Sequence, residues 1–153
     1  MKLMKKILIG IVVIAAIIVG VYFYATGSAE KLTEYELGGD KVASINAVIG
    51  ETRKVTGVDV GTSVTTSGSA QHKQYNYETE SMVQDLTTYS LYLQNNGWMV
   101  TQGYNLSVGK GEMQFGIESE ESGKILIMAI AFDQGMYAIR ITKTEGTLTR
   151  NQP

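Results

Sequence analysis

The sequence contains no cysteine and only one histidine, His72. A lipid-modified bacterial N-terminus requires a cysteine, so that kind of anchor is excluded. Disulfides are excluded as well, so a domain outside the cell would depend on its hydrophobic core. A single histidine without cysteine cannot form a zinc site. We therefore expect no metal or other cofactor, and a neutral His72 on the surface.

Motifs typical of catalysis are also missing. There is no Gly-x-Ser-x-Gly elbow, and Gly109-Lys110-Gly111 lacks the gap, the Ser/Thr and the following helix of a phosphate-binding loop. The acidic residues Glu118, Glu120 and Glu121 lack the spacing of a calcium loop, so a solvated turn is favoured. A cell-surface enzyme would have to use carboxylates, and the candidates are Asp59, Asp85 and Asp133.

Charge is absent from one long stretch, Ile7 to Tyr24, which is apolar over eighteen residues. As a helix it would cover about 27 Å, close to the hydrocarbon thickness of a bilayer. Lys2, Lys5 and Lys6 precede it, and basic residues stay on the cytoplasmic side. We expect a single-pass anchor in the lipid bilayer of the cell membrane, with the N-terminus cytoplasmic and the C-terminal domain outside. Its membrane-anchor residues are Ile7, Ile11, Ile14, Ile18, Tyr22, Phe23 and Tyr24.

A cleaved signal peptide is the alternative, and cleavage would make the protein secreted. The apolar core of a signal peptide has roughly 7–15 residues and is followed by small residues at the cleavage site. Gly27-Ser28-Ala29 offers such a site. The greater length of the apolar run and the aromatic residues at its end favour an uncleaved anchor.

The chain beyond the anchor is acidic, because it carries all 15 Asp and Glu residues but lacks three of the 13 basic ones. This balance argues against a nucleic acid as partner. The length suffices for one domain with a modest core. We place that domain at residues 41–145, after a cytoplasmic tip and transmembrane helix at 1–25 and a juxtamembrane linker at 26–40, and before a tail at 146–153.

Apolar periodicity predicts one main helix in this domain. Residues 81–96 carry Val83, Leu86, Tyr89 and Leu93 at helical spacing, and Asn96-Gly97 supplies a C-terminal stop. Trp98 follows and is expected to pack back under the end of the helix. The same residues predict a core between helix and sheet, made of Leu86, Leu93, Phe115, Leu126, Met128 and Ile139.

Alternation of apolar and polar residues predicts strands at 71–78, 112–118 and 137–142. Hairpin turns are expected at 109–111, 121–123 and 133–135. Upstream, 42–49 fits a strand by its period of two, but it also fits an amphipathic helix capped by Asp40. A second strand is expected at 54–60, and the Thr, Ser and Gly residues of 61–70 indicate a loop.

Residues 125–132 differ from the other strands because they are apolar on both faces. Such a strand is expected in the centre of a sheet and covered on both sides. The helix would cover one side. The other side would be covered by the N-terminal hairpin, through the row Ala43, Ile45, Ala47 and Ile49, or by a partner or a second copy.

These observations predict an α+β fold, in which an N-terminal transmembrane helix is followed by a mostly antiparallel β-sheet packed against one main α-helix. The function we infer is a non-enzymatic domain outside the cell that binds a protein or cell-wall component or assembles with itself. The alternatives are the carboxylate enzyme and a small structural subunit of a membrane complex. The residues proposed for an interaction face are Tyr75, Tyr77, Ile125 and Ile127.

Overall fold

A computed structural model of the chain describes residues 32–65 and 68–149. Its elements, in chain order, are β1 (Glu34–Leu37), β2 (Asp40–Ala43), α2 (Ile45–Ile49), β3 (Val55–Thr65), β4 (Gly68–Glu78), α3 (Met82–Asn95), β5 (Met99–Gln102), the 3-10 turn η1 (Leu106–Val108), β6 (Lys110–Glu118), β7 (Lys124–Asp133) and β8 (Met136–Glu145). The predicted anchor lies outside the described residues. Within the described ranges, no helix is long and apolar enough to span a membrane.

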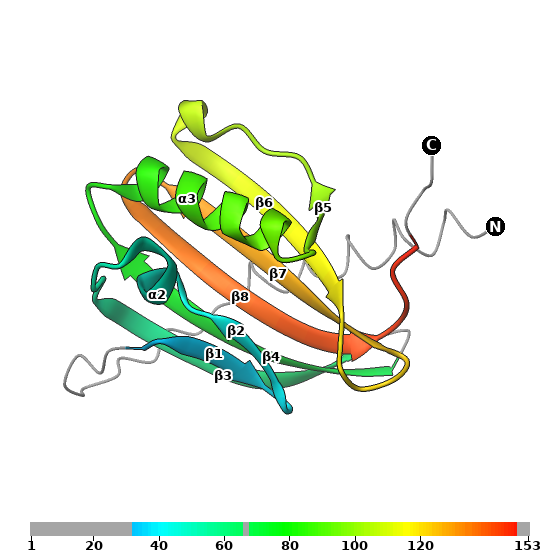
Figure 1. Cartoon of the computed structure of the whole chain (residues 1–153). Coiled ribbons are helices and arrows are strands. Elements are labelled where there is room, and N and C mark those ends of the chain that lie inside the picture. The colour runs from blue at the N-terminus through cyan, green and yellow to red at the C-terminus, as the bar shows by residue number, and fades with distance from the viewer. Residues whose placement is uncertain (1–31, 66–67, 150–153) are drawn as a thin grey trace.

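Six strands form one sheet in the order β3-β4-β8-β7-β6-β5, and each neighbouring pair is antiparallel. The strands β1 and β2 form a separate hairpin. Figure 1 shows α3, α2 and this hairpin on the same face of the six-stranded sheet. The prediction of an α+β domain with a mostly antiparallel sheet and one main helix is confirmed.

The three strands β6, β7 and β8 form the predicted meander of hairpins. Gln134 and Gly135 connect β7 to β8 with φ values of 42° and 86°. Two successive positive φ values define the type I′ turn that matches the twist of paired strands. This turn fixes the register so that Met128 and Ile130 of β7 face the helix.

Helix α3 begins and ends within one residue of the predicted range. Leu86, Tyr89 and Leu93 are fully buried on its sheet side. The backbone N–H of Trp98 donates to the carbonyl of Leu93 at 3.0 Å, and the indole is buried, so the predicted packing under the helix end is confirmed. Val83 does not belong to the buried stripe, since it is 47% exposed.

Residues 42–49 are neither a continuous strand nor a helix capped by Asp40. Val42 and Ala43 end β2, and Ser44 then caps the short helix α2 by accepting a hydrogen bond from the N–H of Ala47. Ser44 is a preferred N-cap residue, and Gly50 ends the helix in the left-handed conformation. The strand prediction is therefore wrong for the second half of this segment.

The described part of the predicted linker belongs to the folded domain. Tyr35 and Leu37 of β1 are 1% and 5% exposed and lie in the core. Asp40 is also buried, and its Oδ2 forms an ion pair with Nζ of Lys143 at 2.9 Å. The boundary of the domain therefore lies before β1 and not at residue 41.

The predicted loop at 61–70 is also corrected. Residues 61–65 continue β3 and residues 68–70 begin β4, with ladder pairs such as Thr62 with Gln71 and Ser63 with Ala70. Glycine is depleted in strands whereas threonine is enriched, and the cross-strand partners extend the hairpin beyond its apolar part.

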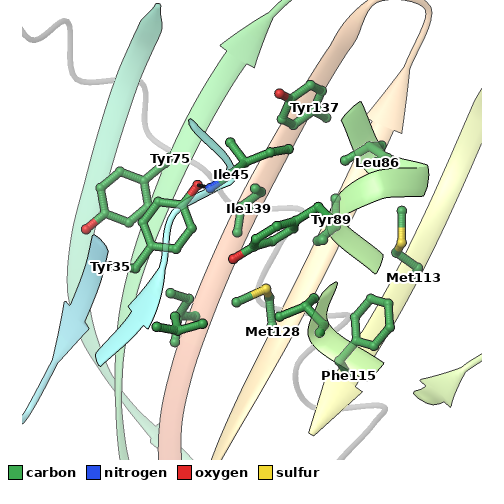
Figure 2. Packing of buried hydrophobic residues seen from close by; sticks show 14 of the residues in the cluster. Tyr35, Ile45, Tyr75, Leu86, Tyr89, Met113, Phe115, Met128, Tyr137 and Ile139 are labelled. Atoms are coloured by element: carbon green, nitrogen blue, oxygen red, sulfur yellow. Dashed lines mark hydrogen bonds between the residues drawn. The ribbon is translucent and has the colours of Figure 1, made fainter. Parts of the chain in front are cut away.

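The main core lies between the sheet and the layer formed by α2, α3, β1 and β2 (Figure 2). The six residues predicted to share this core all belong to it. Strand β7 lies between β8 and β6, so its predicted central position is confirmed. Ile45 lies in this main core, so the N-terminal hairpin does not cover the second side of β7, and that prediction is wrong.

Candidate functional site

Two of the four residues proposed for an interaction face lie in the core. Tyr75 and Tyr77 are 7% and 1% exposed. The ring of Tyr75 stacks on Tyr35, with centroids 4.6 Å apart, and the hydroxyls of Tyr77 and Tyr35 form a hydrogen bond of 2.7 Å. Burial raises the pKa of the Tyr77 phenol well above its usual value. The proposed recognition face is corrected, because these tyrosines are structural residues on the α3 side of the sheet.

Ile125 and Ile127 lie on the opposite side of the sheet, which we call the far face. They form a second small core with Ala129, and Leu148 of the predicted tail packs against it. Ile125 and Ile127 are themselves buried, at 1% and 3% exposure. The far face is therefore not a simple solvated surface, although the alternation of its strands predicts one.

The three candidate carboxylates are not brought together. Asp85 on α3 is buried on the core side, where it accepts two hydrogen bonds from Arg53, of 2.8 and 3.0 Å, and one from the Tyr137 hydroxyl at 3.1 Å. Asp59 lies on the far face. Asp133 lies at the end of β7 and pairs with Lys110 at 3.2 Å. The sheet thus separates Asp85 from Asp59.

His72 also differs from its prediction, because it is not a free surface residue. Its Nε2 lies 3.2 Å from Oδ2 of Asp59, and its side chain is 15% exposed. The ring packs over Gly61, where an added Cβ would lie 2.6 Å from the imidazole. A larger residue at position 61 would therefore displace the imidazole from its place beside Asp59.

The far face carries four polar side chains at one level of the sheet, interrupted by one alanine. The ladder registers align Asp59, Gln74, Arg140, Ala129 and Gln114 across β3, β4, β8, β7 and β6. We call the four polar residues Asp59, Gln74, Arg140 and Gln114 the polar row. Their alternate neighbours Tyr75, Phe115 and Ile139 point into the main core, so the row points away from α3.

The polar row is buried but incompletely hydrogen-bonded. Gln74, Gln114 and Arg140 are 8%, 2% and 3% exposed. Five buried side-chain atoms have no partner among the described residues, and they are Gln74 Oε1, Glu112 Oε1, Gln114 Nε2, Arg140 Nε and Arg140 Nη1. Buried polar atoms are nearly always hydrogen-bonded in folded proteins. All five belong to the far face, which makes it the exceptional region of the described chain.

The hydrogen bonds that do exist in the row leave these atoms free. Gln74 Nε2 donates to Asn76 Oδ1 at 3.0 Å, and Thr101 Oγ1 donates to Gln114 Oε1 at 3.0 Å. Among the described residues Arg140 has one side-chain hydrogen bond, in which Nη2 donates to Asp59 Oδ2 across a long distance of 3.5 Å. An arginine has five N–H donors and no acceptor. Most of the donor capacity of Arg140 is therefore unused.

A groove of about 690 Å³ adjoins the polar row on the same face. The groove is lined by Gly57, Ala138, Ala131 and Glu112. The strand registers align these four residues across β3, β8, β7 and β6, two residues along each strand from the level of the polar row. The small side chains of glycine and alanine leave the space open. Asn76, Glu78 and Lys110 also border it.

Burial shifts the pKa values of two groups on the far face, Glu112 and Arg140, in opposite directions. It raises the pKa of the Glu112 carboxyl above its usual value. It lowers the pKa of Arg140, although the charge of Asp59 and its hydrogen bond act the other way. Both shifts have the same cause, since each charged group has lost water and has not gained a full set of partners.

The described residues contain no group of three or more histidine, aspartate or glutamate side chains arranged to hold a metal ion. What the far face offers instead is hydrogen bonding. Arg140 and Gln114 supply free donors, and Gln74 and Glu112 supply free acceptors. Of these four residues Glu112 is the one that lines the groove, so the groove can bind a polar ligand that donates to this carboxylate.

Sequence reasoning missed this site because Gln114 and Arg140 occupy the polar positions of alternating strands. One signal was present, namely the second apolar row of β7, which indicates that the far side of the sheet is covered. Comparison with known proteins adds no further indication, because no family model, no curated protein and no solved structure matches the chain.

Proposed function

We propose that this protein is a non-enzymatic binding protein of the cell envelope. In this proposal residues 7–24 anchor it in the cell membrane, and the domain outside binds a polar ligand on the far face of its six-stranded sheet. The ligand occupies the groove and contacts Glu112, which lines it. The anchor rests on the uncharged apolar run and the lysines before it.

The observation that carries the binding site is the set of five buried polar atoms without partners. Each such atom costs roughly 1–3 kcal/mol relative to a satisfied one. A fold has only about 5–15 kcal/mol of net stability, so an arrangement of this kind needs a reason. A ligand that donates to Glu112, the one of these residues that lines the groove, would recover part of this cost on binding.

The absence of cysteine allows the topology to be tested with single introduced cysteines. Ser122 lies in the exposed turn between β6 and β7, and Lys5 precedes the apolar run. In intact cells, a membrane-impermeant maleimide should label Ser122→Cys and leave Lys5→Cys unlabelled until the cells are lysed. Labelling of Ser122→Cys only after lysis would contradict the proposed orientation. Loss of residue 5 from the mature chain would show that the segment is a cleaved signal peptide.

Occupancy of the groove can be tested in the same way. Ala131 lines the groove and is partly exposed, so Ala131→Cys adds a thiol there with little change of volume. The full-length protein in detergent is treated with N-ethylmaleimide, with and without a soluble digest of the source cell envelope. The digest should slow the reaction at residue 131.

Ser122→Cys is the matched control, since it lies in a turn outside the groove. Its reaction rate should not respond to the digest. Equal rates at residue 131 with and without the digest would contradict a binding function for the groove. A slower rate at both positions would show a general effect on the reagent, and it would likewise fail to support the site.

A further inference from the structure

Strand β3 forms one edge of the six-stranded sheet, and its outer side is a second surface that can take a partner. We propose that this edge pairs with β3 of a second copy of the chain, so that the two sheets join into one continuous sheet. The two strands run antiparallel about a two-fold axis at Gly61. This inference goes beyond the proposed function and does not depend on a ligand in the groove.

The outer edge of β3 is long and unpaired within the described ranges. Strand β3 is the last in the strand order and has β4 as its neighbour on one side. It has 11 residues, whereas β5 at the opposite edge has 4. A strand at an edge presents backbone N–H and C=O groups that no neighbouring strand satisfies, and it can therefore serve as a template for another strand. Strand β3 offers the longer of the two edges.

Features that usually block pairing at an edge are scarce in β3. Natural edge strands are protected by lysine, proline, short length or bulges. Residues 55–65 contain neither lysine nor proline, and their one register shift lies at the start, between Val55 and Gly57. Asp59 is the only charged residue, and its carboxylate lies against His72 and Arg140 of its own sheet, at 3.2 and 3.5 Å. Beyond Gly57 the strand is therefore open to pairing.

Apolar side chains lie exposed along the same edge. Val60 and Val64 are 64% and 91% exposed. Val58 packs against the main core, and residues two apart point to the same face, so all three valines lie on the α3 side of β3. Pairs of β-branched residues that face one another across two strands stabilise a sheet. A paired strand would therefore cover apolar surface that is now in water.

The partner that fits this edge is a second copy, because the strand is self-complementary. The regular part of β3 runs from Gly57 to Thr65 and has Gly61 at its midpoint. In an antiparallel pair centred on Gly61, every residue of 57–65 lies opposite a residue of the other copy. Val58 then lies opposite Val64 of the second copy, and Val60 lies opposite Thr62.

The far face of the joined sheet tolerates the same register. Asp59 lies opposite Ser63 of the second copy, so two carboxylates do not face one another, as like charges would do at a cost. Both copies use the same surface, as the two halves of a two-fold dimer must. Residues directly opposite in an antiparallel pair point to one side of the sheet. Both far faces therefore lie on the same side, away from both α3 helices.

Cross-linking between single cysteines tests the register, because the chain has no cysteine of its own. Val58→Cys and Val64→Cys proteins of full length, with different tags, are produced in the same cells, purified in detergent and treated with a short bifunctional thiol reagent. Opposite residues have Cβ atoms about 5 Å apart, but residues 58 of the two copies would lie about 20 Å apart. The mixture should therefore cross-link roughly tenfold more than either protein alone.

Leu91→Cys is the matched control for chance collisions, since Leu91 is 56% exposed but lies on α3. A mixture of Leu91→Cys with Val64→Cys should cross-link no more than either protein alone. Cross-linking of the Val58→Cys and Val64→Cys mixture that is no stronger than that of this control would overturn the proposed pairing.

A charge within the edge should separate the two copies. Val60→Lys places an ammonium group in the contact, and it should lower the cross-linking of the cysteine pair by roughly tenfold or more, because the charge would lose water on pairing. Val83→Lys is the control, since Val83 is 47% exposed on α3, and it should leave the cross-linking unchanged. Trp98 fluorescence checks that both proteins unfold at the wild-type Tm. Thr62→Lys, exposed on the same strand, repeats the test if Val60→Lys lowers Tm.

Cross-linking that stays unchanged in a folded Val60→Lys or Thr62→Lys protein would show that the contact lies elsewhere and would also overturn the inference. Neither outcome bears on the groove, because the protection of Ala131→Cys tests it separately.

Discussion

Replacing Arg53 with methionine should destabilise the fold far more than the same replacement of Arg140, although Arg140 is the more deeply buried of the two. The side chains of Arg53 and Arg140 are 16% and 4% exposed. Arg53 donates from Nε and Nη2 to the two oxygens of Asp85 and from Nη1 to Glu51 at 2.7 Å. Arg140 has one long contact and two unpaired nitrogens.

The expected loss of stability in Arg53→Met follows from the partners that remain for Asp85. Asp85 is 2% exposed, and after the change it would keep only the Tyr137 hydroxyl as a side-chain partner. Breaking a buried ion pair in this way costs about 3–5 kcal/mol. For a domain of this size, about 4 °C of Tm corresponds to 1 kcal/mol, so Tm should fall by roughly 10–20 °C.

For Arg140→Met we expect little or no loss of stability. Methionine has a similar length and removes the unpaired donors, and Asp59 keeps its contact with His72. The stability should change by less than about 1 kcal/mol or increase, because burying an unpaired polar group costs about 1–3 kcal/mol. Trp98 is the only tryptophan and is buried, so its fluorescence reports unfolding of the full-length protein for both variants.

Two outcomes of this comparison would refute the reasoning. Lys73→Met serves as the control for loss of a positive charge, and it should unfold close to the wild type. If Arg140→Met lowers Tm as much as Arg53→Met does, Arg140 is a structural residue and its unpaired donors are not a cost to the fold. An unchanged Tm for Arg53→Met would show that the pair with Asp85 contributes little.

Three further predictions concern the core and the ionisable groups. Leu126→Ala should cost about 2–5 kcal/mol, since the side chain lies in the main core, and a Tm within a degree or two of wild type would contradict its placement. Burial acts to raise the pKa of Asp40, but hydrogen bonds from Lys143, Glu120 and Ser119 outweigh it and hold the pKa below its usual value. Asp40 therefore stabilises the fold above pH ~4 and loses this effect as pH falls through its folded pKa, so the cost of Asp40→Asn should shrink in acid unfolding curves. The raised pKa of Glu112 has the reverse sign, so Glu112→Gln should raise Tm at pH ~7 and have no effect at pH ~3, and a lower Tm at neutral pH would contradict it.

The meander and α3 could be predicted because local signals agree there with the tertiary structure. The apolar residues at every second position of β6 and β8 lie in the main core, and Gln134-Gly135 supplies the turn. The segment 42–49 could not be assigned, because its apolar residues fit both periods. The N-cap hydrogen bond of Ser44 distinguishes the two in the structure.

The candidate site could not be predicted in the same way. Alternation assigns Gln114 and Arg140 to the face away from the core, and this part is correct. Their burial depends on what packs on that face, which the pattern of one strand does not contain. The second apolar row of β7, with Ile125 and Ile127, was the only local indication that the far face is buried.

The claim that the far face is a binding site is tested most directly by protection of Ala131→Cys in two backgrounds, Glu112→Met and Lys73→Met, because Glu112 lines the groove and Lys73 does not. The measured quantity is the rate of N-ethylmaleimide reaction with and without the envelope digest. We predict that the digest protects residue 131 in the Lys73→Met protein and does not protect it in a stably folded Glu112→Met protein. Equal protection in both backgrounds would contradict the role of Glu112 and of the groove in binding.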